Sequence, residues 1–150
     1  MAVGGYGRGD LLPASDIDLM ILTQPRINAT LRSQIERFLT HLWDLGLQVG
    51  HSVRTVRQCV AEAKADVTVV TNLIEARQVC GDRRLFDDMI RATGPEHIWP
   101  THKYFKAKLS EQSARHQRYE HSEHSLEPNV KEGPGGLRAI QMIGWVAKRH

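Results

Sequence analysis

Residues 2–23 read AVGGYGRGDLLPASDIDLMILT, a glycine-rich turn followed by two aspartates in an apolar segment. Asp16 and Asp18 are separated by one residue, so both side chains emerge on the same face of a strand, while Ile17 and Leu19 point to the other face. Two carboxylates held side by side repel each other, and a divalent cation between them relieves this repulsion. Mg²⁺ prefers carboxylate oxygens and keeps positions open for water and phosphates. The spacing therefore predicts a Mg²⁺ site at Asp16 and Asp18.

The glycine-rich turn suggests a phosphate-binding element. Its glycines permit positive φ angles and close approach of the backbone, so that successive N–H groups can surround a triphosphate. Arg8 is expected to be an exposed cation within this turn. A glycine-rich run alone is more often a hairpin bend, but the aspartate pair that follows makes the combined pattern far more specific. The expected nucleotide-binding residues are Gly4, Gly5, Arg8 and Ser15.

A Gly-Gly turn followed by Asp-hydrophobic-Asp resembles the signature of nucleotidyltransferases related to DNA polymerase beta. Residues 4–19 also resemble the opening of the uridylyltransferase domain in the protein-PII uridylyltransferases of bacterial nitrogen control. Two later blocks, residues 51–55 (HSVRT) and residues 126–138 followed by 145–150, are similar to the same family, so the likeness covers essentially the full chain. The resemblance implies an α+β, polymerase-beta-like fold in which a small mixed sheet with helices is followed by a helical region.

The same resemblance implies an activity. It is Mg²⁺-dependent uridylyl transfer from UTP to a tyrosine of the PII signal protein, with Asp16 and Asp18 as catalytic and metal-binding residues. Such enzymes are cytoplasmic, multifunctional and part of nitrogen regulation. The chain contains no His-Asp dipeptide, so the uridylyl-removing centre is expected to lie outside it. Two alternatives are an inactive or nucleotide-binding remnant domain, and a nucleotidyltransferase of other specificity, such as adenylyl transfer.

The third metal ligand is left open by the sequence. This superfamily often places a third carboxylate on the next strand, but residues 46–55 contain no acid. Asp66 and Glu75 are candidates, although each is equally typical of a helix cap or a surface charge. Ala139 stands where the family pattern Gly-Gly-Leu-Arg-Asp has an acid.

Hydrophobic periodicity predicts the order of elements. A first strand at the start of the chain is followed by a strand over 16–23, a helix over 28–45 and a strand over 47–55. Helices are then expected over 56–63, 66–77, 85–93, 101–122 and 137–150. Residues 1–95 are interpreted as a catalytic core truncated at its N-terminus, and residues 96–150 as the start of a helical region.

Composition excludes several classes of protein. Lys and Arg number 20 against 17 Asp and Glu, a net charge of +3 with mixed signs along the chain, so nonspecific nucleic-acid binding is not indicated. Cys59 and Cys80 are far apart, which argues against a zinc site or a disulfide framework. No apolar run is long enough for a membrane span. We therefore expect a cytoplasmic protein with neither nucleic-acid nor membrane partners.

Overall fold

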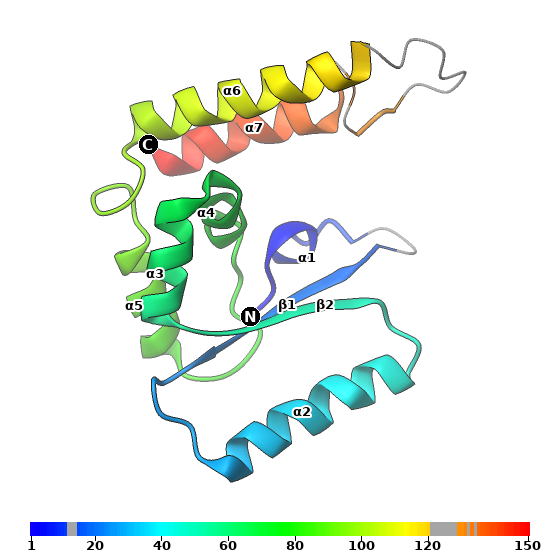
Figure 1. Cartoon of the computed structure of the whole chain (residues 1–150), viewed down its shortest axis with the longest axis vertical. Helices are drawn as coiled ribbons and strands as arrows, with labels where there is room; N and C mark the ends of the chain where they lie inside the picture. The colour runs from blue at the N-terminus through cyan, green and yellow to red at the C-terminus, as the bar shows by residue number, and fades with distance from the viewer. Residues whose placement is uncertain (12–14, 121–128, 132, 134) are drawn as a thin grey trace. The chain divides into compact units, whose positions relative to one another are not determined.

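The structure is a computed structural model that describes residues 1–11, 15–120, 129–131, 133 and 135–150 (Figure 1). Contacts divide the chain into two compact units, Met1–Thr93 and Gly94–His150. The division into domains at residues 95 and 96 stays a prediction. Among the described residues, no helix combines the length and the apolar character needed to cross a membrane.

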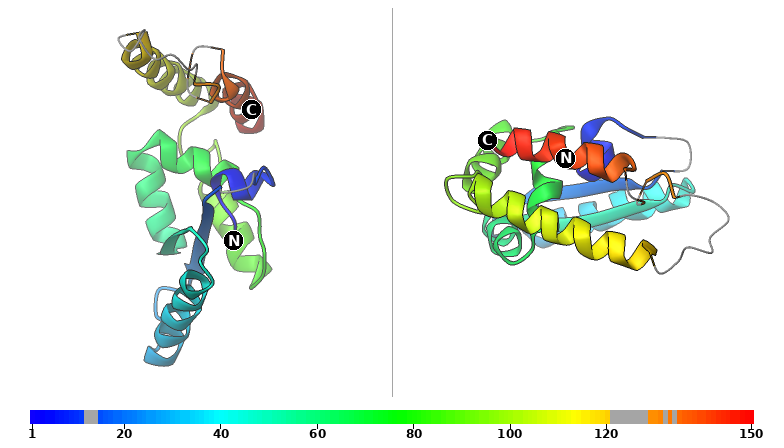
Figure 2. Two further views of the ribbon diagram at one scale, coloured as in Figure 1. Left: turned by 90° about the vertical axis from the view of Figure 1, so that its right-hand side faces the viewer. Right: turned by 90° about the horizontal axis from the view of Figure 1, so that it is seen from above.

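The first unit combines a small sheet with short helices. Its elements are α1 (Gly4–Arg8), β1 (Ile17–Thr23), α2 (Ala29–Asp44), β2 (Val49–Thr55), α3 (Val56–Ala65), α4 (Val67–Ile74) and α5 (Arg83–Ala92). In Figures 1 and 2, α2 lies on the opposite side of the two strands from α1 and α4. The predicted α+β class is confirmed.

The strands β1 and β2 pair in parallel, and α2 forms the connection between them. Their register runs from Ile17 opposite Val49 to Thr23 opposite Thr55. The structure begins β1 one residue later and β2 two residues later than the sequence predicts. Both strands end at the predicted residue. The register places Gly50 directly opposite Asp18.

The strand expected at the start of the chain does not form. Ala2 instead makes isolated antiparallel bridges to Leu19 and to Arg77. The backbone leaves the extended conformation at Gly4, where φ is 56° and α1 begins. The pairing of Ala2 with Arg77 also explains why α4 ends at Ile74 rather than at residue 77, because the following backbone is extended against Ala2.

Side-chain caps set the starts of α2 and α4. The Asn28 side chain accepts a hydrogen bond from the Leu31 amide at 2.8 Å, and the Asp66 side chain accepts one from the Thr68 amide at 2.7 Å. Each bond satisfies an amide that has no partner inside its helix. Gly46, with φ 75°, follows the last turn of α2 in the left-handed conformation. The predicted caps at Asp66 and Gly46 are confirmed.

A mostly buried ion pair fastens α1 to the end of α4. Arg8 Nη1 donates to Glu75 Oε2 at 2.7 Å, and the two side chains are 19% and 2% exposed. The backbones also meet closely, because a Cβ on Gly7 would lie 2.1 Å from the carbonyl oxygen of Glu75. Only glycine fits at this position, so α1 rests directly on the C-terminus of α4.

The second unit contains α6 (Thr101–Glu120) and α7 (Leu137–Arg149), which pack side by side (Figure 1). Thr101 Oγ1 donates to the Arg149 carbonyl oxygen at 2.8 Å, so the start of α6 meets the end of α7 and the helices are antiparallel. The buried Arg149 guanidinium donates to the carbonyl oxygens of Ile98 and Trp99. These bonds hold the segment before α6 against the end of α7.

A buried lysine lies between α6 and α7. The Lys108 side chain is 2% exposed, donates to Glu111 Oε2 at 2.6 Å and places Nζ 4.7 Å from the centre of the Trp145 ring. Burial lowers the pKa of Lys108, and the hydrogen bond to Glu111 opposes this change. Tyr104, on the same face of α6, is fully buried. The face of α6 that contains Tyr104 and Lys108 thus packs on α7.

The lysine carries a desolvation cost that an apolar side chain would not. Lys108→Met should therefore leave the melting temperature unchanged or raise it. Glu111→Gln removes the charge that balances the ammonium group and should lower the free energy of unfolding by about 1–3 kcal/mol. Thermal and urea melts followed by circular dichroism test both changes. A Lys108→Met chain that melts well below the wild type would contradict this account.

The ion pair between Arg8 and Glu75 should contribute more to the free energy of unfolding than the pair between Lys108 and Glu111. Glu75→Gln leaves the guanidinium without its buried partner and should cost about 3 kcal/mol, the lower end for a buried pair, because Arg8 keeps some solvent contact. Asp10→Asn is the matched control, since the 61% exposed Asp10 bonds the same Arg8 at 2.8 Å. That change should alter stability by at most about 0.5 kcal/mol. Equal losses in urea melts of the two variants would refute the assignment.

Candidate functional site

The two predicted aspartates lie at the start of β1. Asp16 immediately precedes the strand and is exposed, and Asp18 is its second residue and half-buried. The Ile17 amide donates to the Gln48 carbonyl oxygen at 2.8 Å, so the extended pairing begins right after Asp16. The spacing of Asp16 and Asp18 is that of one strand face, but Asp16 itself precedes the strand, so the shared face of the two carboxylates stays a prediction.

The Asp18 carboxylate occupies a gap between two glycines. A Cβ on Gly4 would lie 2.9 Å from Asp18 Oδ2, and a Cβ on Gly50 would lie 2.8 Å from Asp18 Oδ1. Both distances are too short for real contacts, so side chains at these positions would displace the carboxylate. Gly4 belongs to α1 and Gly50 to β2, and the Val3 amide also donates to the Asp18 carbonyl oxygen at 3.0 Å. Two elements, α1 and β2, thus surround one carboxylate.

Gly50 was not identified from the sequence. The signal that could have found it is a glycine inside a strand pattern, which often marks a close approach of another group. Without the register of β1 and β2, however, the sequence does not show which group approaches.

The glycine-rich turn folds as a short helix rather than as an open loop. Only Gly4 and Gly9 of its glycines have positive φ, at 56° and 83°. Gly7 is required by the contact with Glu75 described above, and a Cβ on Gly5 would meet only Arg8 Nη2 at 3.7 Å. The turn therefore serves packing at Gly7 and leaves space beside Asp18 at Gly4.

Arg8 is not the exposed cation that the sequence suggested. Its guanidinium bonds both Asp10 and Glu75, and its side chain is 19% exposed. Burial lowers the pKa of Arg8, but the hydrogen bonds to Asp10 and Glu75 outweigh burial and leave the pKa raised. Arg8 stays a cation at all accessible pH values. Ser15, the remaining predicted nucleotide contact, is exposed directly before Asp16.

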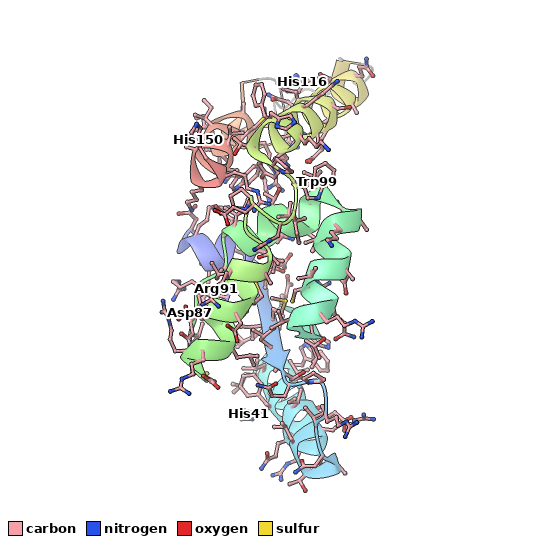
Figure 3. The ribbon with its side chains drawn as sticks, turned by 90° about the vertical axis from the view of Figure 1, so that its left-hand side faces the viewer. His41, Asp87, Arg91, Trp99, His116 and His150 are labelled. Atoms are coloured by element: carbon pink, nitrogen blue, oxygen red, sulfur yellow. The ribbon has the colours of Figure 1, made fainter. Side chains whose placement is uncertain are left out.

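The two candidates for a third acidic ligand have structural roles. Asp66 caps α4, and Glu75 pairs with Arg8 at the other end of the same helix, so the interpretation of Glu75 as a surface charge is wrong. Within the described ranges, no three His, Cys, Asp or Glu residues are arranged to hold a metal ion. Figure 3 labels His41, His116 and His150, which belong to α2, α6 and the end of the chain.

Ala139 lies in the first turn of α7, which contains no acidic residue. Its amide donates to the carbonyl oxygen of Gly136, the N-cap of the helix, which itself makes no side-chain cap. The helix thus begins on backbone hydrogen bonds alone.

Comparisons with known proteins agree with the resemblance found in the sequence. Residues 1–80 match the family described as a nucleotidyltransferase domain, and residues 103–150 match the family described as GlnD PII-uridylyltransferase. No solved structure matches the chain.

Curated relatives with the same description match the chain over its entire length. The chain is 56% identical over 150 residues to the bifunctional uridylyltransferase/uridylyl-removing enzyme of Pseudomonas fluorescens strain SBW25, and 54% identical to that of Pseudomonas aeruginosa strain LESB58. Each alignment covers 100% of the chain and 17% of the relative. The resemblance to uridylyltransferases is thereby confirmed. Because the nucleotidyltransferase family matches more than half of its residues, the chain belongs to the nucleotidyltransferase domain family.

Proposed function

We propose that this chain transfers a uridylyl group from UTP to a tyrosine hydroxyl of a PII signal protein, using Mg²⁺ bound by Asp16 and Asp18. The observation that carries the proposal is the gap between Gly4 and Gly50, which gives the Asp18 carboxylate a defined place near the start of β1. The choice of UTP and PII is supported by the names of the relatives, which share this sequence over its whole length. Cytoplasmic nitrogen regulation follows from the same proposal.

The donor atoms suit Mg²⁺. Both aspartates offer hard carboxylate oxygens, and the exposure of Asp16 leaves room for water and phosphate ligands. When bound, Mg²⁺ would neutralise negative charge on the α-phosphate and on the departing pyrophosphate. The protein would then mainly orient the reactants, which is the larger part of catalysis in phosphoryl transfer.

The remaining residues would hold the nucleotide. Gly4 and Gly5 are the first two residues of α1, and Ser15 is next to Asp16, so backbone amides and a hydroxyl can bond phosphate oxygens there. Arg8 has five N–H donors and can present further donors to a phosphate while it bonds Asp10 and Glu75. The tyrosine oxygen would attack the α-phosphorus in line. Its bond to phosphorus forms as the bond to pyrophosphate breaks, and the hydroxyl proton passes to water.

A domain that binds nucleotide without catalysis is the second candidate. It is favoured by the absence of a third acidic ligand among the described residues and by Ala139. A nucleotidyltransferase of other specificity, such as an adenylyltransferase, is a further alternative. The test is to incubate the chain with Mg²⁺, PII and each α-³²P-labelled nucleoside triphosphate in turn. Label on PII from UTP alone supports the proposal, whereas label from ATP alone or from no nucleotide contradicts it.

The aspartates should be essential to the metal-dependent state but not to the fold. Asp16→Asn and Asp18→Asn should each abolish transfer and the stabilisation by Mg-UTP, while the melting temperature without ligand stays equal or rises slightly, because the repulsion between the carboxylates is removed. Asp44→Asn, an exposed aspartate on α2, is the control for loss of one charge. Thermal melts with and without Mg-UTP decide the question. Wild-type shifts in both site variants would show that these aspartates do not bind the metal.

The glycine opposite Asp18 should tolerate no side chain. Gly50→Ala places a methyl group 2.8 Å from Asp18 Oδ1, too close for a real contact, so Mg-UTP binding should weaken about tenfold or more as the carboxylate is displaced. The matched control is Gly144→Ala in α7, where a Cβ would meet nothing within 4 Å. Calorimetric titration with a non-hydrolysable UTP analogue and Mg²⁺ measures both. Equal affinity of Gly50→Ala and wild type would mean that the position of Asp18 is not critical.

A further inference from the structure

Asn72 lies on α4 beside the two elements that surround Asp18. The helix is oriented by its cap at Asp66 and by the buried side chains of Val70 and Leu73, which face the core. Asn72 is exposed on the other side of the same helix. Its carboxamide is therefore open to a ligand, while its backbone is held by a packed helix.

The carboxamide oxygen of Asn72 and the carboxylate of Asp18 approach one point. That point is the position of a Cβ on Gly4, which would lie 2.9 Å from Asp18 Oδ2 and 4.0 Å from Asn72 Oδ1. Because Gly4 has no side chain, no Cβ fills that point between the two oxygens. The oxygens come from β1 and α4, and the space lies beside the first residue of α1.

The carboxamide oxygen of Asn72 can supply a third oxygen donor, which the acidic residues do not provide. Asp16 and Asp18 supply two carboxylates, and the described part of the chain brings no third acidic ligand to them. A carboxamide oxygen is a hard, neutral donor of the kind that Mg²⁺ and Ca²⁺ accept. A neutral third donor would also keep the site at two negative charges, which matches one divalent cation.

We infer that Asn72 is a metal ligand. Its Oδ1 would be the third oxygen donor from the protein to the divalent cation that Asp16 and Asp18 bind. The inference rests on the proposed function, because it takes the aspartate pair to be the metal site. It adds a residue on α4 whose position neither the strand pattern nor the glycine-rich turn reveals.

Two substitutions should shift metal binding in opposite directions. Asn72→Ala removes the oxygen and should raise the Mg²⁺ concentration for half-maximal stabilisation by UTP about tenfold or more, since loss of even an outer partner of a metal site costs this much. Asn72→Asp adds a negative charge and should lower that concentration. The matched control is Thr68→Ala, an exposed residue one turn earlier on α4, which should leave the metal dependence unchanged.

Metal binding is measured by thermal melts over a Mg²⁺ titration, and directly by electron paramagnetic resonance of Mn²⁺ with the unmodified and variant chains. Melts in EDTA show whether each variant folds. Unchanged metal affinity in both Asn72 variants would overturn the inference. The proposed function fails separately, if Asp18→Asn keeps the wild-type response to Mg-UTP; loss of that response in Asp18→Asn with no effect at Asn72 would reject only the role of Asn72.

Discussion

The parallel pairing of β1 with β2 is the constraint on which the candidate site depends. Its register sets Gly50 opposite Asp18, and the absence of a side chain at Gly50 leaves room for one carboxylate oxygen. The other oxygen lies beside Gly4, where a positive φ turns the chain from the extended segment into α1. A shift of the register by one residue would turn the aspartates to the other face of the strand. The register of the two strands therefore determines the geometry of the site.

The short helix α1 owes its place to interactions distant in the sequence. A helix of five residues is too short to be stable alone, because nucleation costs more than its few hydrogen bonds return. Arg8 fastens it to the buried carboxylate of Glu75, Gly7 lets the two backbones touch, and Ala2 bonds the backbone of Arg77 in both directions at 2.9 Å. These contacts also orient α4, so they determine where Asn72 stands relative to Asp18. The glycine-rich segment therefore has a packing role in addition to its proposed binding role.

The helical unit depends on a different interaction. Lys108 is buried against the face of Trp145 and is balanced by Glu111 one turn away. A charge in this position carries a desolvation cost that the aromatic face and the carboxylate offset. Where the end of α7 meets the start of α6, the Arg149 guanidinium donates to the Trp99 carbonyl oxygen in the segment before α6. Polar contacts of this kind select one alignment of α6 and α7.

The sequence by itself determined the order of the elements from β1 to α7, the caps at Asp66 and Gly46, and the family. All of these depend on local periodicity, on cap chemistry or on motif spacing, which neighbouring residues specify. Only the tertiary structure decided that Ala2 forms bridges rather than a strand, that Arg8 is bound to Glu75, and that Gly50 and Asn72 lie beside Asp18. Each of these facts depends on contacts between residues far apart in the chain. Strand register and helix packing create such contacts, and no local pattern encodes them.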